Sequence, residues 1–304
     1  MQVFVTGATG FIGSAVVPEL INAGHQVLGL TRTDAGAKSL LDAGAQVHRG
    51  DLEDLESLRS GAAMADGVIH LAFNHDFSKF AANCEMDRLA IEALGSALVG
   101  SDRPLVVTSG TGLIAPGRLA TEDDVPSSGS TSVPRVSEQT AASLAARGVR
   151  ASVVRLPQVH NRLKQGLVSY MIAAAREKGV SAFVGDGLNR WPAVPLLDAA
   201  HLYRLVLEKT ATTKESAGAR YHAVAEEGVP LREIAEAIGR GLKAPVVAMS
   251  PEEAGRHFGF LGFFVGADCP ASSALTQEWL GWRPTMQPGL IADLDRAHVF
   301  EAAQ

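Results

Sequence analysis

The chain has 304 residues, 46% hydrophobic and 20% charged, a balance typical of a globular protein with one large core, or one core and a smaller lobe. Its formal net charge of −6 argues against nucleic acid or an anionic membrane as a partner. The two cysteines, Cys84 and Cys269, lie far apart and have no metal-ligand spacing, which favours a reducing compartment. We find neither a basic-then-apolar leader nor an apolar run of about twenty residues, so we expect a cytoplasmic protein that is neither secreted nor membrane-inserted.

The chain opens with a short β-branched strand pattern, Gln2–Thr6, that runs directly into the glycine-rich residues 7–13 and then into an apolar helical pattern. Such a turn directs backbone N–H groups and the positive end of the helix dipole at one point, which suits a pyrophosphate. We expect Gly7 to make the tight turn, Gly10 to let a phosphate approach the backbone, and Gly13 to let helix and strand pack closely. This predicts a dinucleotide site rather than an ordinary glycine-rich turn.

Strand and helix patterns alternate through the first half of the chain. The predicted strands are residues 2–6, 26–31, 46–49, 68–71, 105–109 and 151–156. The predicted helices are residues 11–23, 35–43, 54–61, 77–98 and 137–146. This order predicts an α/β Rossmann fold, a doubly wound parallel sheet with helices on both faces.

The alternation of strand and helix patterns is less regular in the second half of the chain. The predicted helices are residues 167–178, 198–209 (with Asp198 as N-cap), 231–242, 251–258, 273–280 and 288–299, with one strand at 221–224 and an earlier surface loop at 121–134. We expect residues 1–160, with returning segments near 188–225, to form the NAD(P)-binding Rossmann domain. Residues 161–187 and 226–304 are expected to form a smaller, mainly helical substrate-binding lobe.

Taken in order, several short motifs resemble the extended short-chain dehydrogenase/reductase family (NAD-dependent epimerase/dehydratase-like), over almost the whole chain. Residues 6–13 are similar to its phosphate loop, 50–52 to its adenine motif, 70–73 to the turn beside ribose and nicotinamide, and 155–159 to the strand exit beside the carboxamide. Residues 185–187, 194–198 and 280–284 are similar to its later signatures. The resemblance implies these cofactor-binding residues: Gly7, Ala8, Thr9, Gly10, Phe11, Ile12, Gly13, Thr31, Arg32, Asp51, Leu52, Leu71, Ala72, Phe73, Ser109, Pro157 and Val159.

The end of the second strand decides which cofactor is bound. An NAD enzyme usually places a carboxylate there for the ribose hydroxyls. Here Thr31, Arg32 and Thr33 come first and Asp34 follows late. Arg32 suits a 2′-phosphate through its planar fork, so we expect NADP, with NAD as the alternative if Arg32 is only a solvated surface residue and Asp34 reaches the ribose.

Other cofactor residues have plainer interpretations. Asp51 is either an adenine contact or the N-cap of the helix that begins near Asp54. The apolar shelf at residues 71–73 is also compatible with simple core packing. Pro157 either sets the chain direction beside the carboxamide or merely ends its strand.

The catalytic pair of the family, a tyrosine followed four residues later by a lysine, is absent nearby. The best alignment places Arg135 at the tyrosine position and Gln139 at the lysine position. An arginine stays charged and cannot donate a proton at neutral pH. The family's hydroxyl partner is represented by Ser109, although Gly110 competes for that position. The chain therefore resembles an atypical member of the family.

Three residues are candidates for the missing chemistry, beside Ser109. His75 follows the cofactor shelf, and His160 follows Pro157, and each suits a general acid because the pKa of histidine lies near neutrality. Each is also compatible with a structural hydrogen-bonding role. Arg135 suits a substrate carboxylate or carbonyl oxygen. No spacing suggests a metal.

We therefore expect an NADP(H)-dependent oxidoreductase acting on a small carbonyl compound, alcohol or activated alkene. The alternatives are a non-catalytic NADP-sensing regulatory protein, and a non-redox isomerase or lyase that needs only a base such as His75. The expected partner is a small-molecule substrate, and the resemblance implies a homodimer.

Overall fold

The computed structural model describes residues 1–112, 114–125, 134–284 and 288–300, and the chain divides into two compact units. The first unit comprises residues 1–109, 129–155 and 199–221, and the second comprises residues 110–128, 156–198 and 222–304. The predicted division differs in two ways: it placed 110–128 and 156–160 in the Rossmann domain, and 188–198 and 222–225 among its returning segments. Of the predicted surface loop at 121–134, residues 126–133 lie outside the described residues.

Seven strands form the sheet of the first unit, in the order β10-β6-β5-β4-β1-β2-β3. They are β1 (Gln2–Thr6), β2 (Gln26–Thr31), β3 (Gln46–Arg49), β4 (Gly67–His70), β5 (Pro104–Gly110), β6 (Arg150–Leu156) and β10 (Arg220–His222). The strand β1 is parallel to β2 and to β4, β2 is parallel to β3, and β4 is parallel to β5. The predicted Rossmann fold is confirmed, and the strand order reverses at the β1–β4 pair, where such sheets bind cofactors.

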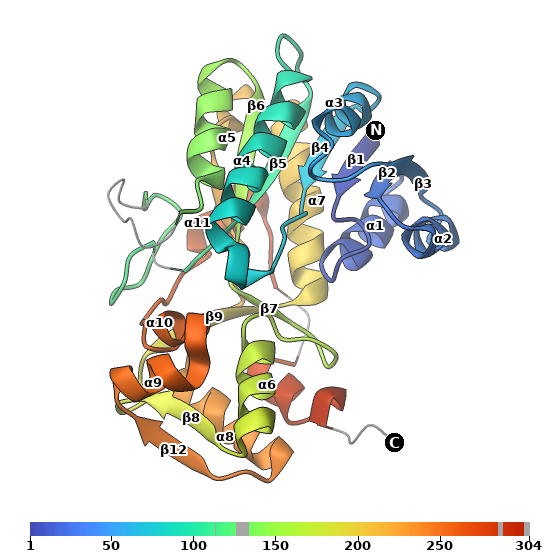
Figure 1. Ribbon diagram of the computed structural model, residues 1–304. Coiled ribbons are helices and arrows are strands. Elements are labelled where there is room, and N and C mark those ends of the chain that lie inside the picture. The colour runs from blue at the N-terminus through green and yellow to red at the C-terminus, as the bar shows by residue number, and fades with distance from the viewer. Residues whose placement is uncertain (113, 126–133, 285–287, 301–304) are drawn as a thin grey trace. The chain divides into compact units, whose positions relative to one another are not determined.

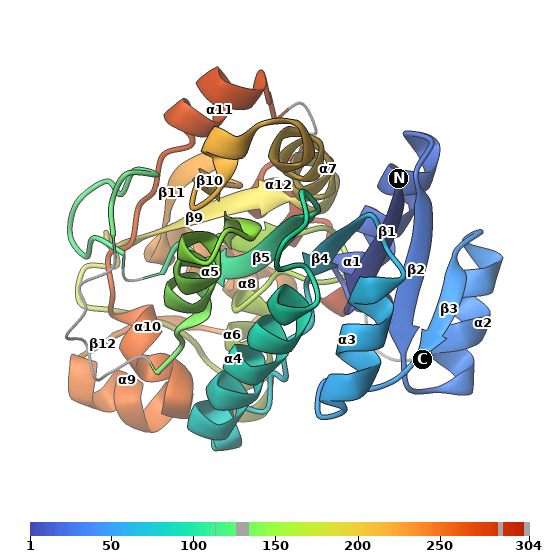
Figure 2. The ribbon, with the colours of Figure 1, turned by 90° about the horizontal axis from the view of Figure 1, so that it is seen from above.

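Helices cover both faces of this sheet. They are α1 (Gly13–Asn22), α2 (Asp34–Asp42), α3 (Leu55–Ala63), α4 (Phe80–Ser96), α5 (Ser137–Ala146) and α7 (Leu196–Thr212), with short 3-10 turns η1 (Phe77–Lys79) and η2 (Lys214–Ser216). In Figure 2, α3, α4 and α5 lie along one face and α7 along the other. Apolar side chains of β1, β4, α3, α4 and α5 form one buried cluster. Its burial stabilises the elements that hold the site.

The second unit contains two small sheets, one with the order β11-β9-β7 and one of β12 and β8 (Figure 1). The strands are β7 (Gln158–His160), β8 (Ser181–Val184), β9 (Arg190–Pro195), β11 (Glu226–Pro230) and β12 (Val246–Met249). The helices and turns are α6 (Val168–Lys178), α8 (Leu231–Leu242), α9 (Pro251–Phe258), η3 (Gly259–Leu261), α10 (Gly262–Val265), α11 (Ala274–Leu280), α12 (Leu290–Leu294) and η4 (His298–Phe300).

Several predicted boundaries in the second half are wrong. None of the five strands β7, β8, β9, β11 and β12 was predicted, because this part of the chain lacks the regular alternation of strand and helix patterns that identified equally short strands in the first half. Asp198 lies inside α7, which begins two residues earlier, so it is not an N-cap. The helix predicted at 288–299 is limited to α12 and the turn η4.

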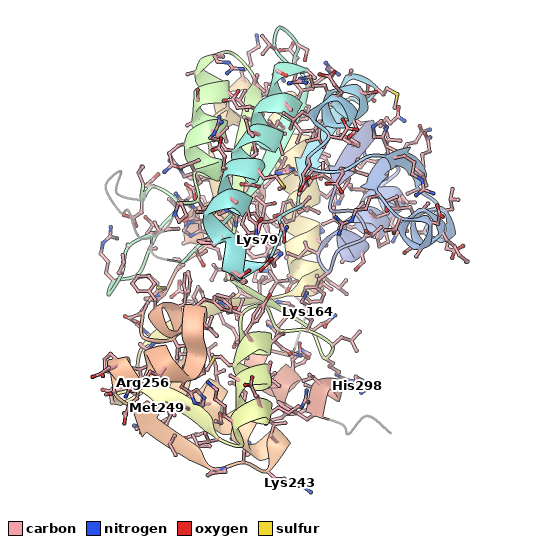
Figure 3. The ribbon with its side chains drawn as sticks, in the orientation of Figure 1. Lys79, Lys164, Lys243, Met249, Arg256 and His298 are labelled. Carbon is pink, nitrogen blue, oxygen red and sulfur yellow. The ribbon has the colours of Figure 1, made fainter. Side chains whose placement is uncertain are left out.

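None of the described helices is long and apolar enough to cross a membrane. The C-cap of the helix α8 is Lys243, which is labelled in Figure 3. Lys243 has a φ of +54°, in the left-handed region that usually favours glycine at a helix C-terminus.

Candidate functional site

The glycine turn after β1 has the predicted geometry. Gly7 has a φ of +67°, a conformation that side chains rarely adopt. A Cβ atom at Gly13 would lie 2.1 Å from the carbonyl oxygen of Gly7, so only glycine fits where α1 leaves the turn. The Gly10 amide donates to the same carbonyl at 2.9 Å, and a Cβ atom at Gly10 would have only this oxygen, at 3.1 Å, within van der Waals reach.

The turn leads into the N-terminus of α1, which has no side-chain cap among the described residues. Thr9 and Gly10 are exposed. The first N–H groups of a helix lack intrahelical acceptors and carry partial positive charge. An exposed glycine backbone beside such a helix end fits the pyrophosphate of a dinucleotide.

The ends of β1 and β4 lie side by side because Thr6 pairs in register with His70. The Leu71 amide donates to the Thr6 carbonyl at 3.3 Å, and the Ala72 amide donates to the Thr6 hydroxyl at 3.4 Å. A Cβ atom at Gly7 would lie 2.8 Å from the Ala72 nitrogen. The shelf predicted at Leu71 and Ala72 therefore borders the glycine turn, and both residues are partly exposed.

The end of β2 presents Arg32 at the surface, with Nη1 3.3 Å from Asp51 Oδ2. Thr33 is the N-cap of α2, because its hydroxyl accepts from an amide of the first turn at 3.1 Å. Asp34 is exposed and pairs with Arg49. The Asp34 carboxylate, which follows the end of β2, thus already has a cationic partner.

Asp51 is not the cap of α3. That cap is Asp54, which accepts from an amide of the first turn at 3.1 Å. Asp51 pairs instead with Arg32, which removes the plainer interpretation of Asp51 as a cap. Leu52 is partly buried against the core, and Thr31 is only 6% exposed.

A network of buried polar side chains runs through the first unit from β1 to α5, and it was not predicted. The His70 ring is hydrogen-bonded to the Thr6 hydroxyl at 2.8 Å through Nδ1 and to Asp87 Oδ1 at 3.2 Å through Nε2. Ser137 donates to Asp87 Oδ2 at 2.5 Å. All four side chains are at most 2% exposed. The available signal was Asp87 itself, a charged residue at a buried position of a predicted helix.

Electrostatics explain how a carboxylate remains charged in this network. Burial raises the pKa of Asp87, but hydrogen bonds from His70 and Ser137 and the charges of His70 and Arg135 outweigh that effect. The net pKa of Asp87 lies below its ordinary value of 3.8. The carboxylate is therefore ionised at neutral pH.

Arg135 lies two residues before α5. Its Nε donates to the Ser137 hydroxyl at 2.9 Å, and Nη2 donates to the Thr108 carbonyl at 3.1 Å. The guanidinium lies 4.5 Å from the centre of the Phe73 ring. Arg135 is thus held in place by several groups while its side chain stays 24% exposed.

Thr108, on β5, connects this arginine to α7. Its hydroxyl donates to the His70 carbonyl at 2.7 Å and shares a 2.7 Å hydrogen bond with the Tyr203 hydroxyl. Burial raises the pKa of Tyr203, so this phenol does not replace the family's tyrosine as a proton carrier. The neighbouring Ser109 is only partly buried. None of the chain's three tyrosines is followed by lysine four residues later.

Four aromatic rings form what we call the aromatic cluster: Phe73, His75, Phe77 and Phe80. Neighbouring ring centres lie 5.3 to 6.3 Å apart, mostly edge to face. His75 is exposed. Asp76 is the N-cap of the turn η1. The cluster therefore places His75 and Phe73 on one surface of the first unit.

His160, Pro157 and Val159 belong to the second unit. The His160 side chain is fully buried, with Nδ1 2.7 Å from Asp293 Oδ2 and Nε2 3.8 Å from Glu226 Oε2. This geometry favours the structural role of His160 over that of a general acid. Val159 is buried in β7, and Pro157 is partly exposed.

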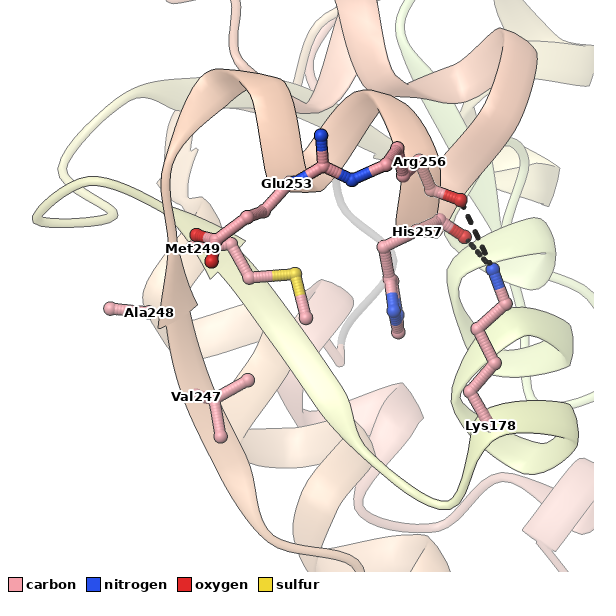
Figure 4. A pocket seen from close by; sticks show the side chains of 7 residues that line it. All are labelled: Lys178, Val247, Ala248, Met249, Glu253, Arg256 and His257. Atoms are coloured by element: carbon pink, nitrogen blue, oxygen red, sulfur yellow. Dashed lines mark hydrogen bonds between the residues drawn. The ribbon is translucent and has the colours of Figure 1, made fainter.

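A shallow hollow of about 450 Å³ lies beside β12 and α9 in the second unit (Figure 4). It is lined by Lys178, Val247, Ala248, Met249, Glu253, Arg256 and His257. Lys178 donates to the backbone carbonyls of Arg256 and His257, so its ammonium stabilises the C-terminal end of α9. None of the predicted site residues lines this hollow. Among the described residues, no group of three or more His, Cys, Asp or Glu side chains is placed to hold a metal ion.

The parallel sheet with its switch at β1 and β4, and the glycine turn there, define the dinucleotide-binding class of α/β proteins. Residues 3–217 match the NAD dependent epimerase/dehydratase family. The chain belongs to this family, which places it in the extended short-chain dehydrogenase/reductase class.

The chain is similar to several known proteins. Uncharacterized protein C2A9.02 of Schizosaccharomyces pombe is 50% identical over 298 residues, or 97% of this chain and 98% of that protein. The 2-alkyl-3-oxoalkanoate reductase of Stenotrophomonas maltophilia is 29% identical over 266 residues, or 81% of this chain and 77% of that protein. The structure of DesIV, a dTDP-glucose 4,6-dehydratase from Streptomyces venezuelae with NAD and TYD bound, has a TM-score of 0.76 at 20% identity, covering 99% and 96% of the two chains.

Proposed function

We propose that the protein is an NADP(H)-dependent oxidoreductase of the atypical short-chain dehydrogenase/reductase type, acting on a small carbonyl compound, alcohol or activated alkene. The observation that carries the proposal is the glycine turn, where Gly13 has no room for a side chain and the backbone at Gly10 is exposed. A bound nicotinamide cofactor would supply or accept a hydride. The name of the Stenotrophomonas relative, a reductase of an oxoalkanoate, supports a carbonyl substrate.

The surroundings of β2 support NADP over NAD. Arg32 is exposed and offers a planar fork to a 2′-phosphate, while Asp34 is already paired with Arg49. We propose these residues of the first unit as the cofactor site: Gly7, Ala8, Thr9, Gly10, Phe11, Ile12, Gly13, Thr31, Arg32, Asp51, Leu52, Leu71, Ala72, Phe73 and Ser109.

The chain's own residues have separate tasks in the reaction. Arg135 binds the substrate oxygen and stabilises negative charge that develops on it, but it does not supply the proton. His75, exposed in the aromatic cluster, holds the proton at a ring nitrogen. The Ser109 hydroxyl offers a further hydrogen bond.

Calorimetry with NADP+ and NAD+ tests the cofactor. We expect NADP+ to bind about tenfold or more tightly than NAD+. Arg32→Gln removes this preference, whereas the control Arg59→Gln, an exposed arginine paired with Glu56 on α3, retains it. No binding of either dinucleotide overturns the proposal.

Turnover is measured as NADPH absorbance with a panel of ketones, aldehydes and enones. His75→Ala is expected to lower the rate about a hundredfold, and the control His298→Ala leaves it unchanged. Tight NADPH binding without any turnover would favour the regulatory protein instead. Substrate conversion without loss of NADPH would favour an isomerase or lyase. Either outcome contradicts the oxidoreductase.

A further inference from the structure

We propose that Arg135 and the aromatic cluster form a preorganised site for a small aromatic or conjugated carboxylate, or for a conjugated carbonyl oxygen that gains negative charge. This inference rests on the proposed function, because it names the substrate class of the same site. All residues that carry it belong to the first unit. It therefore requires nothing of the second unit.

The Arg135 side chain is held in place, but only part of its hydrogen-bonding capacity is used. Nε and Nη2 each donate one hydrogen bond, to the Ser137 hydroxyl at 2.9 Å and to the Thr108 carbonyl at 3.1 Å. A guanidinium carries five N–H donors, so three have no acceptor among the described residues. A planar fork with donors to spare at a partly exposed position suits the two oxygens of a carboxylate.

Asp87, the nearby acidic residue, does not accept a hydrogen bond from Arg135. Asp87 Oδ2 lies 3.8 Å from Arg135 Nε, beyond hydrogen-bond distance. Its two oxygens are already engaged, Oδ1 by His70 at 3.2 Å and Oδ2 by Ser137 at 2.5 Å. Asp87 thus offsets part of the positive charge, while three N–H groups of the guanidinium have no acceptor among the residues that the structure describes.

The surroundings of the cation are aromatic. Phe73 lies 4.5 Å from the guanidinium, which favours the cation electrostatically and restricts its rotamers. Phe73 also contacts the rings of His75 at 5.3 Å and Phe80 at 6.3 Å. Aromatic edges beside a charged group favour ligands that join a flat apolar body to an anionic oxygen.

Ser137 is a positioning residue in this arrangement. Its hydroxyl accepts from Arg135 Nε and donates to Asp87, so it sets the distance between cation and buried anion. Ser137 is 1% exposed and does not itself reach a ligand. Its removal should weaken ligand binding through the orientation of Arg135.

The test uses the full chain saturated with NADP+ and three probes, benzoate, benzyl alcohol and acetate, titrated by NMR. Benzoate has both ring and anion, whereas the others have one feature each. We expect benzoate to bind about tenfold or more tightly than either. Arg135→Gln should weaken benzoate about tenfold or more and leave benzyl alcohol unchanged, with Arg135→Lys between the two.

Controls separate ligand binding from folding. Arg147→Gln removes an exposed arginine of α5 that pairs with Glu92, and it should bind benzoate like the wild type. Ser137→Ala should weaken benzoate binding about threefold, and Ser137→Thr should restore part of it. Each variant must keep its NADP+ affinity and cooperative unfolding.

The outcomes distinguish the two proposals. Unchanged benzoate affinity in Arg135→Gln, or an equal loss in Arg147→Gln, overturns the carboxylate site while the cofactor proposal stands. Benzoate binding that depends on Arg135 in a chain without NADP+ affinity supports the site and overturns the proposed function. Equal affinity for benzoate and acetate overturns the aromatic part of the inference.

Discussion

Single backbone positions set the geometry of the dinucleotide turn. Gly13 is required because α1 starts within contact of the Gly7 carbonyl. Lys243 is the opposite case, a side chain at a left-handed position where glycine is the less strained residue. Substitutions at the two positions are therefore expected to change the free energy of unfolding in opposite directions.

Gly13→Ala places a methyl group 2.1 Å from a backbone oxygen, and backbone atoms cannot move aside cheaply. We expect the free energy of unfolding to fall by about 1–3 kcal/mol and NADP+ affinity to fall at least about tenfold. Urea denaturation and calorimetry measure the two effects. The control Gly255→Ala lies in α9 with no atom nearby and should be neutral or slightly stabilising. Wild-type NADP+ affinity in Gly13→Ala would contradict the geometry.

Lys243→Gly relieves the left-handed strain at the end of α8. We expect the free energy of unfolding to rise by about 0.5–1 kcal/mol, as measured by urea denaturation. Lys243→Ala removes the same charge but keeps the Cβ atom, so it should not give this gain. Equal gains in both variants would show that charge, not backbone conformation, is responsible.

At the scale of elements, β1, β4, α4 and α5 are tied by polar as well as apolar contacts. His70 of β4 is hydrogen-bonded to Thr6 of β1 and to Asp87 of α4, and Ser137 at the start of α5 donates to the same Asp87 carboxylate. Buried networks of this kind stabilise only when every member has its partner. The Asp87 carboxylate is the centre of this one.

Asp87→Asn should lower the free energy of unfolding at pH 7 by about 1.5–3 kcal/mol, because charge-assisted hydrogen bonds are lost. The folded-state pKa of Asp87 is lowered, so its contribution is complete above the unfolded pKa of about 3.9 and is lost as pH falls further through the folded pKa. The difference between variant and wild type should therefore shrink below pH 4. Urea denaturation across pH measures it, with exposed Glu85→Gln on the same helix as the control. A difference independent of pH would contradict the assignment of charge.

At the scale of the whole molecule, the chain passes repeatedly between two units, and neither is a continuous segment. The sheet of the first unit receives β10 late in the chain, and α7 covers one of its faces. Tyr203 of α7 is buried against Thr108 of β5. The first unit is therefore completed by residues far beyond its first six strands.

A fragment of residues 1–160 should not fold cooperatively, because it lacks α7 and β10 and exposes the sheet face that α7 covers. Near-UV circular dichroism and urea denaturation, with the full chain as reference, test this. A sigmoidal transition with native-like near-UV signal in the fragment would show that residues 1–160 fold without α7 and β10.

The sequence predicted the first unit well because its strands and helices alternate regularly between clear turn signals. The bounds of β1, β2, β3 and α5 agree with those predicted, and the glycine turn was identified by residue. In the second unit the bounds of the helix α8 also agree. The strands of the second unit were missed, since they lack the regular strand–helix alternation that supported the equally short strands of the first unit. The buried network was missed because its members come from four distant segments and only packing brings them together.

The sequence by itself determined the parallel α/β order, the dinucleotide turn and the absence of a tyrosine–lysine pair. Each of these depends only on residues that lie close together in the sequence. Only the tertiary structure decided that His160 is buried, that Asp54 caps α3, and that Arg135 is held between Phe73, Ser137 and Thr108. Burial and hydrogen-bond geometry depend on which distant segments pack together, and local pattern does not encode them.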